Sequence, residues 1–150
     1  MDSRYQQYHN NYIPIGQPES TMILAHMNGR NETPANNTAA TGHLVGLLSP
    51  DGNRFDFVLH TQGLENIISA HFHLGAAGTN GRVVKSINID PRGLAIGSWT
   101  ISDSQPLTRD LTYHLKAGTI YTDVHTSQYP DGEIRGQTND VSQRQYLIFR

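Results

Sequence analysis

The chain has 150 residues, a formal net charge of −2 and no cysteine. That length fits one domain with its own core. The weak net charge offers no broad field for nucleic acid, so no nucleic-acid partner is expected. The lack of cysteine excludes a disulfide framework, a thiolate metal site and a cysteine nucleophile. No apolar run is long enough to span a bilayer, and residues 1–17 lack the apolar segment of a secretory signal, so we expect neither membrane insertion nor a signal peptide.

Residues 1–20 form a segment of distinct composition, rich in Tyr, Gln and Asn and poor in side chains that can build a core. This composition is typical of a flexible arm. It also suits an assembly arm that pairs with the sheet edge of a neighbouring subunit. The sequence leaves both interpretations open.

Alternation of apolar and polar residues predicts strands along most of the remaining chain. Two Pro-Asp-Gly sequences, at 50–52 and 130–132, are strong turn signals because proline presets one turn dihedral and glycine accepts a positive φ. The expected strands cover 21–28, 40–48, 54–60, 69–75, 82–89, 94–101, 119–126 and 133–137, with one further strand within 141–150.

Residues 104–117 follow a different pattern, because leucines recur at helical spacing between a possible cap, Ser104 or Thr108, and Gly118. We expect one short helix there, covering a barrel end or a sheet edge. About eight short strands with one helix predict an all-β fold, an antiparallel Greek-key-like sandwich or barrel. This domain spans 21–138, and 139–150 is a C-terminal tail or extra strand.

A pair of histidines lies in the strand expected over 69–75. The period of two places His71 and His73 on the face opposite Phe72, and it places Asp123 and His125 together in the later strand. Because imidazole is the commonest protein metal ligand and suits both copper and zinc, these four residues predict a metal site. Asp123 is either a fourth ligand or the group that orients an imidazole. The alternative is a set of hydrogen-bonded structural histidines.

The glycine-rich loop 75–81 follows the histidine strand directly. It lacks the Lys-Ser/Thr ending of a phosphate-binding loop and no helix follows it, so we expect its backbone to pass close to the histidines. Further along, Glu133 and Arg135 share a face of a predicted strand. We expect them to form an ion pair that anchors this strand to a loop. These patterns predict no catalytic residue.

Three motifs between about residues 22 and 137 resemble the CHRD domain, the module repeated in chordin. The opening motif is Leu24, Gly29, Glu32, Pro34, Thr38, Ala40 and Gly42; the middle one is Gly63-Leu64, Ala70-His71-Phe72-His73-Leu74-Gly75, Gly78, Asn80-Gly81 and Val83-Val84; the closing one is Gly118, Tyr121, Val124-His125-Thr126 and Gly132-Glu133-Ile134-Arg135-Gly136. Asp123 stands where that family usually has Asn. The resemblance implies a β-rich module of the extracellular type, whose biochemical activity is poorly defined. A cell surface or a spore coat would suit such a module without a visible signal peptide.

A second, weaker resemblance is to the copper half of copper/zinc superoxide dismutases. It implies that His71, His73 and His125 bind copper and that Arg135 guides an anion, although the bridging histidine, the zinc ligands and the disulfide have no counterpart. The leading hypothesis is a non-catalytic CHRD-type surface or structural module that self-associates through its terminal segments or binds another surface protein. The alternatives are a copper-dependent redox enzyme and a module that binds a protein ligand.

Overall fold

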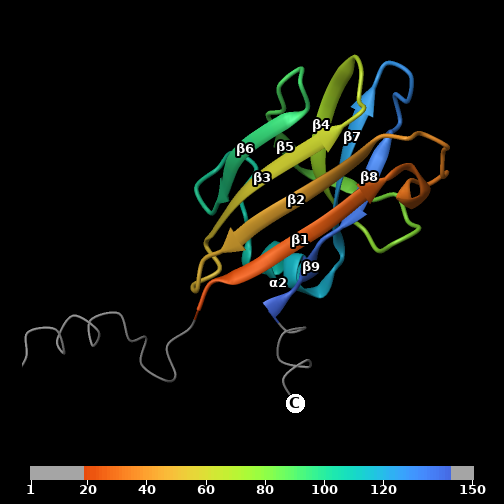
Figure 1. The fold of residues 1–150 in the computed structure, drawn as a ribbon. Coiled ribbons are helices and arrows are strands. Elements are labelled where there is room, and N and C mark those ends of the chain that lie inside the picture. Colours follow the sequence, from red (N-terminus) through yellow and green to blue (C-terminus); the bar gives the residue numbers. More distant parts are fainter. Residues whose placement is uncertain (1–18, 143–150) are drawn as a thin grey trace, which may run out of the picture.

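The computed structural model describes residues 19–142, in which antiparallel strands form one sheet that curls into a nearly closed barrel (Figure 1). Along the sheet the strands follow the order β5-β4-β7-β8-β1-β2-β3-β6, and a short β9 also pairs with β1. Their bounds are β1 Thr21–Asn28, β2 Thr41–Leu48, β3 Arg54–Gln62, β4 Ile67–Leu74, β5 Arg82–Ile87, β6 Leu94–Thr100, β7 Ile120–Thr126, β8 Ile134–Gln137 and β9 Asn139–Asp140. The predicted all-β class is confirmed.

The strand predictions between residues 21 and 137 are confirmed, with bounds shifted by no more than two residues. The further strand expected within 141–150 falls mostly on residues 143–150, which lie outside the described residues. The chain pairs with β1 just before that segment, through β9.

The helix α2, Arg109–Ala117, lies at one end of the barrel beside β9 (Figure 1). Thr108 is its N-cap and accepts a hydrogen bond from the backbone N–H of Leu111 at 3.2 Å. Gly118 ends it in the left-handed conformation, at φ 81°. Leu111 and Leu115 are buried against the barrel core, so the helix closes this end as predicted. Within residues 19–142, no helix combines the length and the apolar character needed to cross a membrane.

Aromatic side chains fill the middle of the barrel. The ring of Phe72 on β4 stacks on that of Trp99 on β6, with centroids 5.3 Å apart, and Phe57 meets Phe72 edge to face at 5.1 Å. Gly46 on β2 makes room for the ring of Phe55 on β3, because a Cβ at Gly46 would lie 2.3 Å from that ring. The core therefore links β4, which carries two of the predicted metal ligands, to the opposite wall of the barrel.

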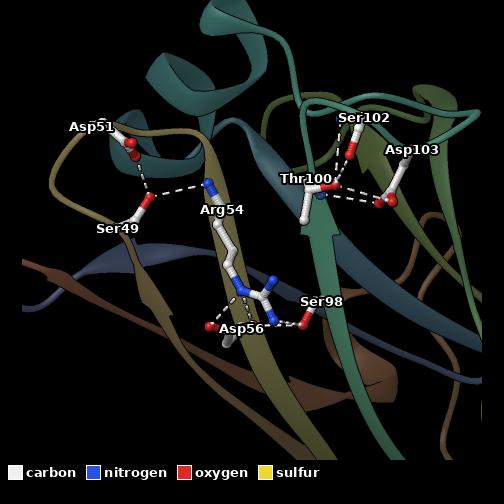
Figure 2. Close-up of polar contacts among 8 residues, drawn as sticks. All are labelled: Ser49, Asp51, Arg54, Asp56, Ser98, Thr100, Ser102 and Asp103. Atoms are coloured by element: carbon white, nitrogen blue, oxygen red, sulfur yellow. Dashed lines mark hydrogen bonds and ion pairs between the residues drawn. The ribbon is translucent and has the colours of Figure 1, made fainter.

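The two edge strands, β5 and β6, come side by side (Figure 1), and polar side chains bridge the seam between them. Lys85 Nζ lies 3.1 Å from Asp103 Oδ2, and the backbone N–H of Ser86 donates to Gln105 Oε1. Figure 2 shows how Thr100 at the end of β6 holds Asp103 in the turn. The turn after β6 thus takes the place of direct strand pairing across the seam.

Candidate metal centre

The outward side chains of β4, β7 and β8 form a polar grid on one side of the barrel. Strand register places Asp123 on β7 between His71 on β4 and Arg135 on β8. The next row holds Tyr121 on β7 between His73 and Gln137. All residues of β7 are buried except His125, which is half-buried, so both faces of this strand are covered. The outward face of β7 is therefore a second, polar interior.

Four side chains of this grid converge on one point. One nitrogen from each of His71, His73 and His125 and a carboxylate oxygen of Asp123 all lie within 4.8 Å of one another. Asp123 Oδ1 is 2.9 Å from His73 Nε2 and 3.8 Å from His71 Nδ1, and Asp123 Oδ2 is 2.9 Å from His125 Nε2. The structure thus brings together all four residues that the sequence singled out as metal ligands.

Backbone carbonyls fix the orientation of two of the rings. His73 Nδ1 lies 3.0 Å from the carbonyl oxygen of Gly81, and His125 Nδ1 lies 2.8 Å from that of Pro130. A carbonyl only accepts, so each Nδ1 carries a hydrogen and donates it. In a neutral ring Nε2 then holds a lone pair, and in both rings that lone pair is directed toward the Asp123 carboxylate.

Two acceptors facing each other repel unless a cation lies between them, so the cluster requires either added protons or a metal ion. The contact with Asp123 raises the pKa of His125 to about 9, against the opposing effect of burial. Burial alone raises the pKa of Asp123, but the contacts with the three histidines outweigh it and hold that pKa well below its usual range. His71 Nδ1 and His125 Nε2 are buried, and no group within residues 19–142 meets them with hydrogen-bond geometry.

Arg135 is almost fully buried and belongs to the wall of this cluster. Its guanidinium donates to the carbonyl oxygens of Ala76 and Thr79 in the glycine-rich loop, both at 3.0 Å. Its central carbon lies 3.4 Å from the centre of the Tyr121 ring, on the β8 side. On the β4 side, the same ring stacks on His73 with centroids 4.6 Å apart. Arg135 therefore positions the loop and the His73 ring, and it is closed off from solvent anions.

The predicted ion pair between Glu133 and Arg135 is wrong. Glu133 instead accepts hydrogen bonds from the hydroxyls of Thr38, at 2.6 Å, and Thr126, at 2.8 Å. The alternation expected for a strand does not reach Glu133, because β8 begins at Ile134. The expectation for the glycine-rich loop is confirmed, since Gly81 contacts His73 directly.

Glu32 is a buried acid that the site analysis of the sequence did not select. No hydrogen-bond partner meets its Oε1 within the described part of the chain, and the side chain lines two cavities of about 480 and 200 Å³. Burial, reinforced by the charge of Asp123, raises the pKa of Glu32 to about 7. Its place in the opening motif, in a polar loop, was the one signal that could have drawn attention to it.

Taken together, the geometry suits a closed ion site. The ligand set of three imidazoles and one carboxylate fits Zn²⁺ or copper in type and number. The four residues lie beneath covering loops, and the side chains of His71 and His125 are only 20 and 15 % exposed. Such a buried set of four protein ligands is typical of a structural site, because catalytic sites keep a position open for water or substrate.

Comparison with protein-family models matches residues 23–138 to the CHRD domain. The matched segment includes all four converging residues, the glycine-rich loop and the turn after β7. No curated protein and no solved structure gives a significant match to the chain.

Proposed function

Because the chain belongs to the CHRD domain family, we propose that it is a non-catalytic β module stabilised by a zinc or copper ion in the His71/His73/Asp123/His125 centre. The proposal rests on one observation above all. The Nε2 atoms of His73 and His125 both face the carboxylate of Asp123 at 2.9 Å while their Nδ1 atoms donate to backbone carbonyls. This is the arrangement that orients neutral imidazoles for metal binding.

The ion would tie together segments that are far apart in the sequence. His73 is bonded to the glycine-rich loop through Gly81, and His125 is bonded to the turn after β7 through Pro130. A metal between the rings therefore fixes β4, β7, the loop and the turn at once. We expect the bound ion to act mainly on stability, because metal binding to the folded state alone shifts the unfolding equilibrium.

The test is metal analysis and thermal unfolding of tag-free protein after exchange into chelator and then into Zn²⁺ or Cu²⁺. At a free metal concentration of 100 times Kd, the folded state gains about 2.7 kcal/mol, which corresponds to a rise in Tm of roughly 5–10 °C. The double variant His71→Ala/His73→Ala should bind no metal at this centre and show no such rise. Asp123→Asn, which keeps the shape and removes the charge, should reduce the rise.

His114 provides the matched control, because it is a histidine on α2 that bonds to Thr119 and lies outside the cluster. His114→Ala should keep the full rise in Tm. If wild-type protein with an intact near-UV spectrum shows no metal-induced rise with either ion, the metal centre is refuted. The four residues would then be a structural network held by protons.

A copper-dependent redox enzyme is the second candidate function, favoured by the three imidazoles that converge on one point. Copper-loaded protein that consumes superoxide above the level of the double variant would support it. The burial of Arg135, with its guanidinium bound to loop carbonyls, argues against an anion-guiding role. We therefore expect no activity above the variant.

We further propose that the module works at an extracellular, cell or spore surface and that its terminal segments attach it to copies of itself or to another surface protein. The family supports the location, and the Tyr, Gln and Asn content of residues 1–20 supports the attachment. Residues 1–18 and 143–150 lie outside the described residues. Deletion of residues 1–18 should lower the number of chain copies per particle, which light scattering measures. An unchanged number of copies would refute the proposal that these residues mediate attachment.

A further inference from the structure

Three histidines form one row on the open outer face of the barrel, on β1, β2 and β3 rather than on the strands β4 and β7 of the metal centre. Register pairs His26 on β1 with His43 on β2, and His43 with His60 on β3. All three are exposed, and each points away from the core because its strand neighbours on both sides are buried. Neither the fold nor the proposed function accounts for this row.

The first two rings already meet nitrogen to nitrogen. His26 Nδ1 lies 3.0 Å from His43 Nδ1, with ring centroids 5.0 Å apart and nearly perpendicular planes. Without a metal, this contact is a hydrogen bond in which one ring donates and the other accepts. The spacing is also close to that between two nitrogens bound to one ion, since metal–imidazole bonds are about 2.0–2.1 Å long.

We propose that His26, His43 and His60 form a second, surface-exposed site for a divalent transition metal such as Zn²⁺, Ni²⁺ or Cu²⁺. His26 and His43 supply the primary pair through their facing nitrogens. His60 adjoins His43 in the same row, at the short distance of directly paired strand residues, and supplies a third imidazole by rotation of its side chain. The strands fix the three backbone positions, so only side chains must move.

The surroundings of the row define the class of ligand. The flanking outward positions on the three strands are apolar or uncharged: Leu24, Asn28, Thr41, Val45, Val58 and Gln62. Three imidazoles without a carboxylate suit zinc, nickel and copper, whereas magnesium and calcium require oxygen ligands. The site is open to solvent, so the remaining coordination positions are free for water or for a side chain of another molecule.

The test combines calorimetric titration of tag-free protein with Zn²⁺ and NMR spectra recorded with substoichiometric Cu²⁺, whose paramagnetism broadens nearby amide signals. Wild type should bind two Zn²⁺ and His43→Ala only one. His60→Ala should weaken the second site by more than about tenfold, the smaller end of what loss of a supporting group costs a metal site. His114→Ala, the matched control on α2, should keep both sites.

The position of the broadening separates this site from the metal centre. Broadening of β1, β2 and β3 amides that disappears in His43→Ala supports the surface site, whether or not the centre on β4 and β7 binds metal. Broadening confined to β4 and β7, or a Zn²⁺ stoichiometry unchanged in His43→Ala, would overturn it and leave the proposed function intact. The experiment can therefore refute either proposed site independently of the other.

Discussion

Strands β2 and β7 lie on the same barrel and show opposite burial. Along β2 exposed and buried residues alternate strictly, from Thr41 to Leu48. Along β7 the outward residues are covered as well, by the glycine-rich loop and by the turn after β7. The two strands share one inner core, so the difference lies entirely in what covers the outer face.

The open face exposes large apolar side chains together with the ion pair of Arg54 and Asp56, whereas the covered face buries charged side chains. Met22, Val45, Leu47, Val58 and Ile96 are exposed to between 42 and 74 % on the open face. Asp123 and Arg135 are nearly or fully buried on the covered face, and Glu133 is buried beside Thr126 in the interior. Buried charges are costly unless they are paired, so the covered face must satisfy them internally. The covered face therefore depends on contacts with the surrounding loops and strands to hold its charged residues.

The sharpest test of the comparison is to remove the same residue type from each face. Arg135→Leu leaves the carbonyls of Ala76 and Thr79 unpaired and removes a charge from a buried cluster. The free energy of unfolding should fall by about 3–5 kcal/mol. Arg54→Leu removes an exposed ion pair with Asp56, shown in Figure 2, and should lower the free energy of unfolding far less, because solvent screens this pair. Urea unfolding measures both.

If both arginine variants lost the same free energy of unfolding, the burial of Arg135 would add nothing to what this residue contributes to stability. If Arg135→Leu fails to fold, Arg135→Lys serves in its place. Lysine keeps the charge but lacks the planar fork that contacts two carbonyls, so we expect an intermediate loss.

A second test uses pH. Burial raises the pKa of Glu32 to about 7 from its ordinary 4.5, so the folded state holds this proton more tightly than the unfolded state. The resulting stability is present below pH 4.5 and is lost as pH rises through 7. In metal-free protein, Glu32→Gln should therefore unfold less readily than wild type at pH 8, by up to about 3 kcal/mol, with a smaller difference at pH 5.

The exposed Glu65 is the matched control for this measurement, and Glu65→Gln should follow wild type at both pH values. Glu32→Gln that also follows wild type from pH 5 to pH 8 would contradict the prediction. In that case the buried carboxylate has a partner that compensates its charge.

The sequence predicted the strands that form both outer faces of the barrel. It could not show that loops cover one of these faces and leave the other open. Period two correctly placed His71 with His73 and Asp123 with His125, because side-chain direction in a strand is a local property. That β4 and β7 are neighbours depends on strand order, which no local pattern contains. The covering of the outer face depends on loops that approach from other parts of the chain.

Particular residues show where the sequence argument failed and why. Arg135 was expected to pair with Glu133, but it contacts loop carbonyls that belong to no side-chain pattern. Glu32 was not selected because a single acid in a polar loop looks exposed until tertiary contacts bury it. Both roles weighed for Asp123 stay predictions: its carboxylate faces Nε2 of His73 and of His125, while backbone carbonyls contact the Nδ1 atoms of these rings.

A third test compares carboxylates. Glu133 accepts hydrogen bonds from two threonine hydroxyls in the interior, whereas Asp56 contacts Arg54 and Ser98 on the open face. Glu133→Gln leaves one hydroxyl poorly satisfied, and it should cost about 1–3 kcal/mol in urea unfolding. Asp56→Asn should stay below about 1 kcal/mol. A reversed order would mean that the open face, with its hairpin contacts, carries more of the polar stability.

The smallest effect is expected where the open face is apolar. Val58 lies on β3 between Val45 and Ile96 and is 42 % exposed, so Val58→Thr keeps its shape and lets the new hydroxyl reach water. The change in unfolding free energy should stay within about 0.5 kcal/mol. Val84→Thr is the matched change at a buried strand position, where a hydroxyl without a partner costs about 1–3 kcal/mol. If Val58→Thr lost as much unfolding free energy as Val84→Thr, the open face would have to be covered in solution. Copies of the chain that pack on this face would cover it in this way. The masses of the two variants measured by light scattering would then differ.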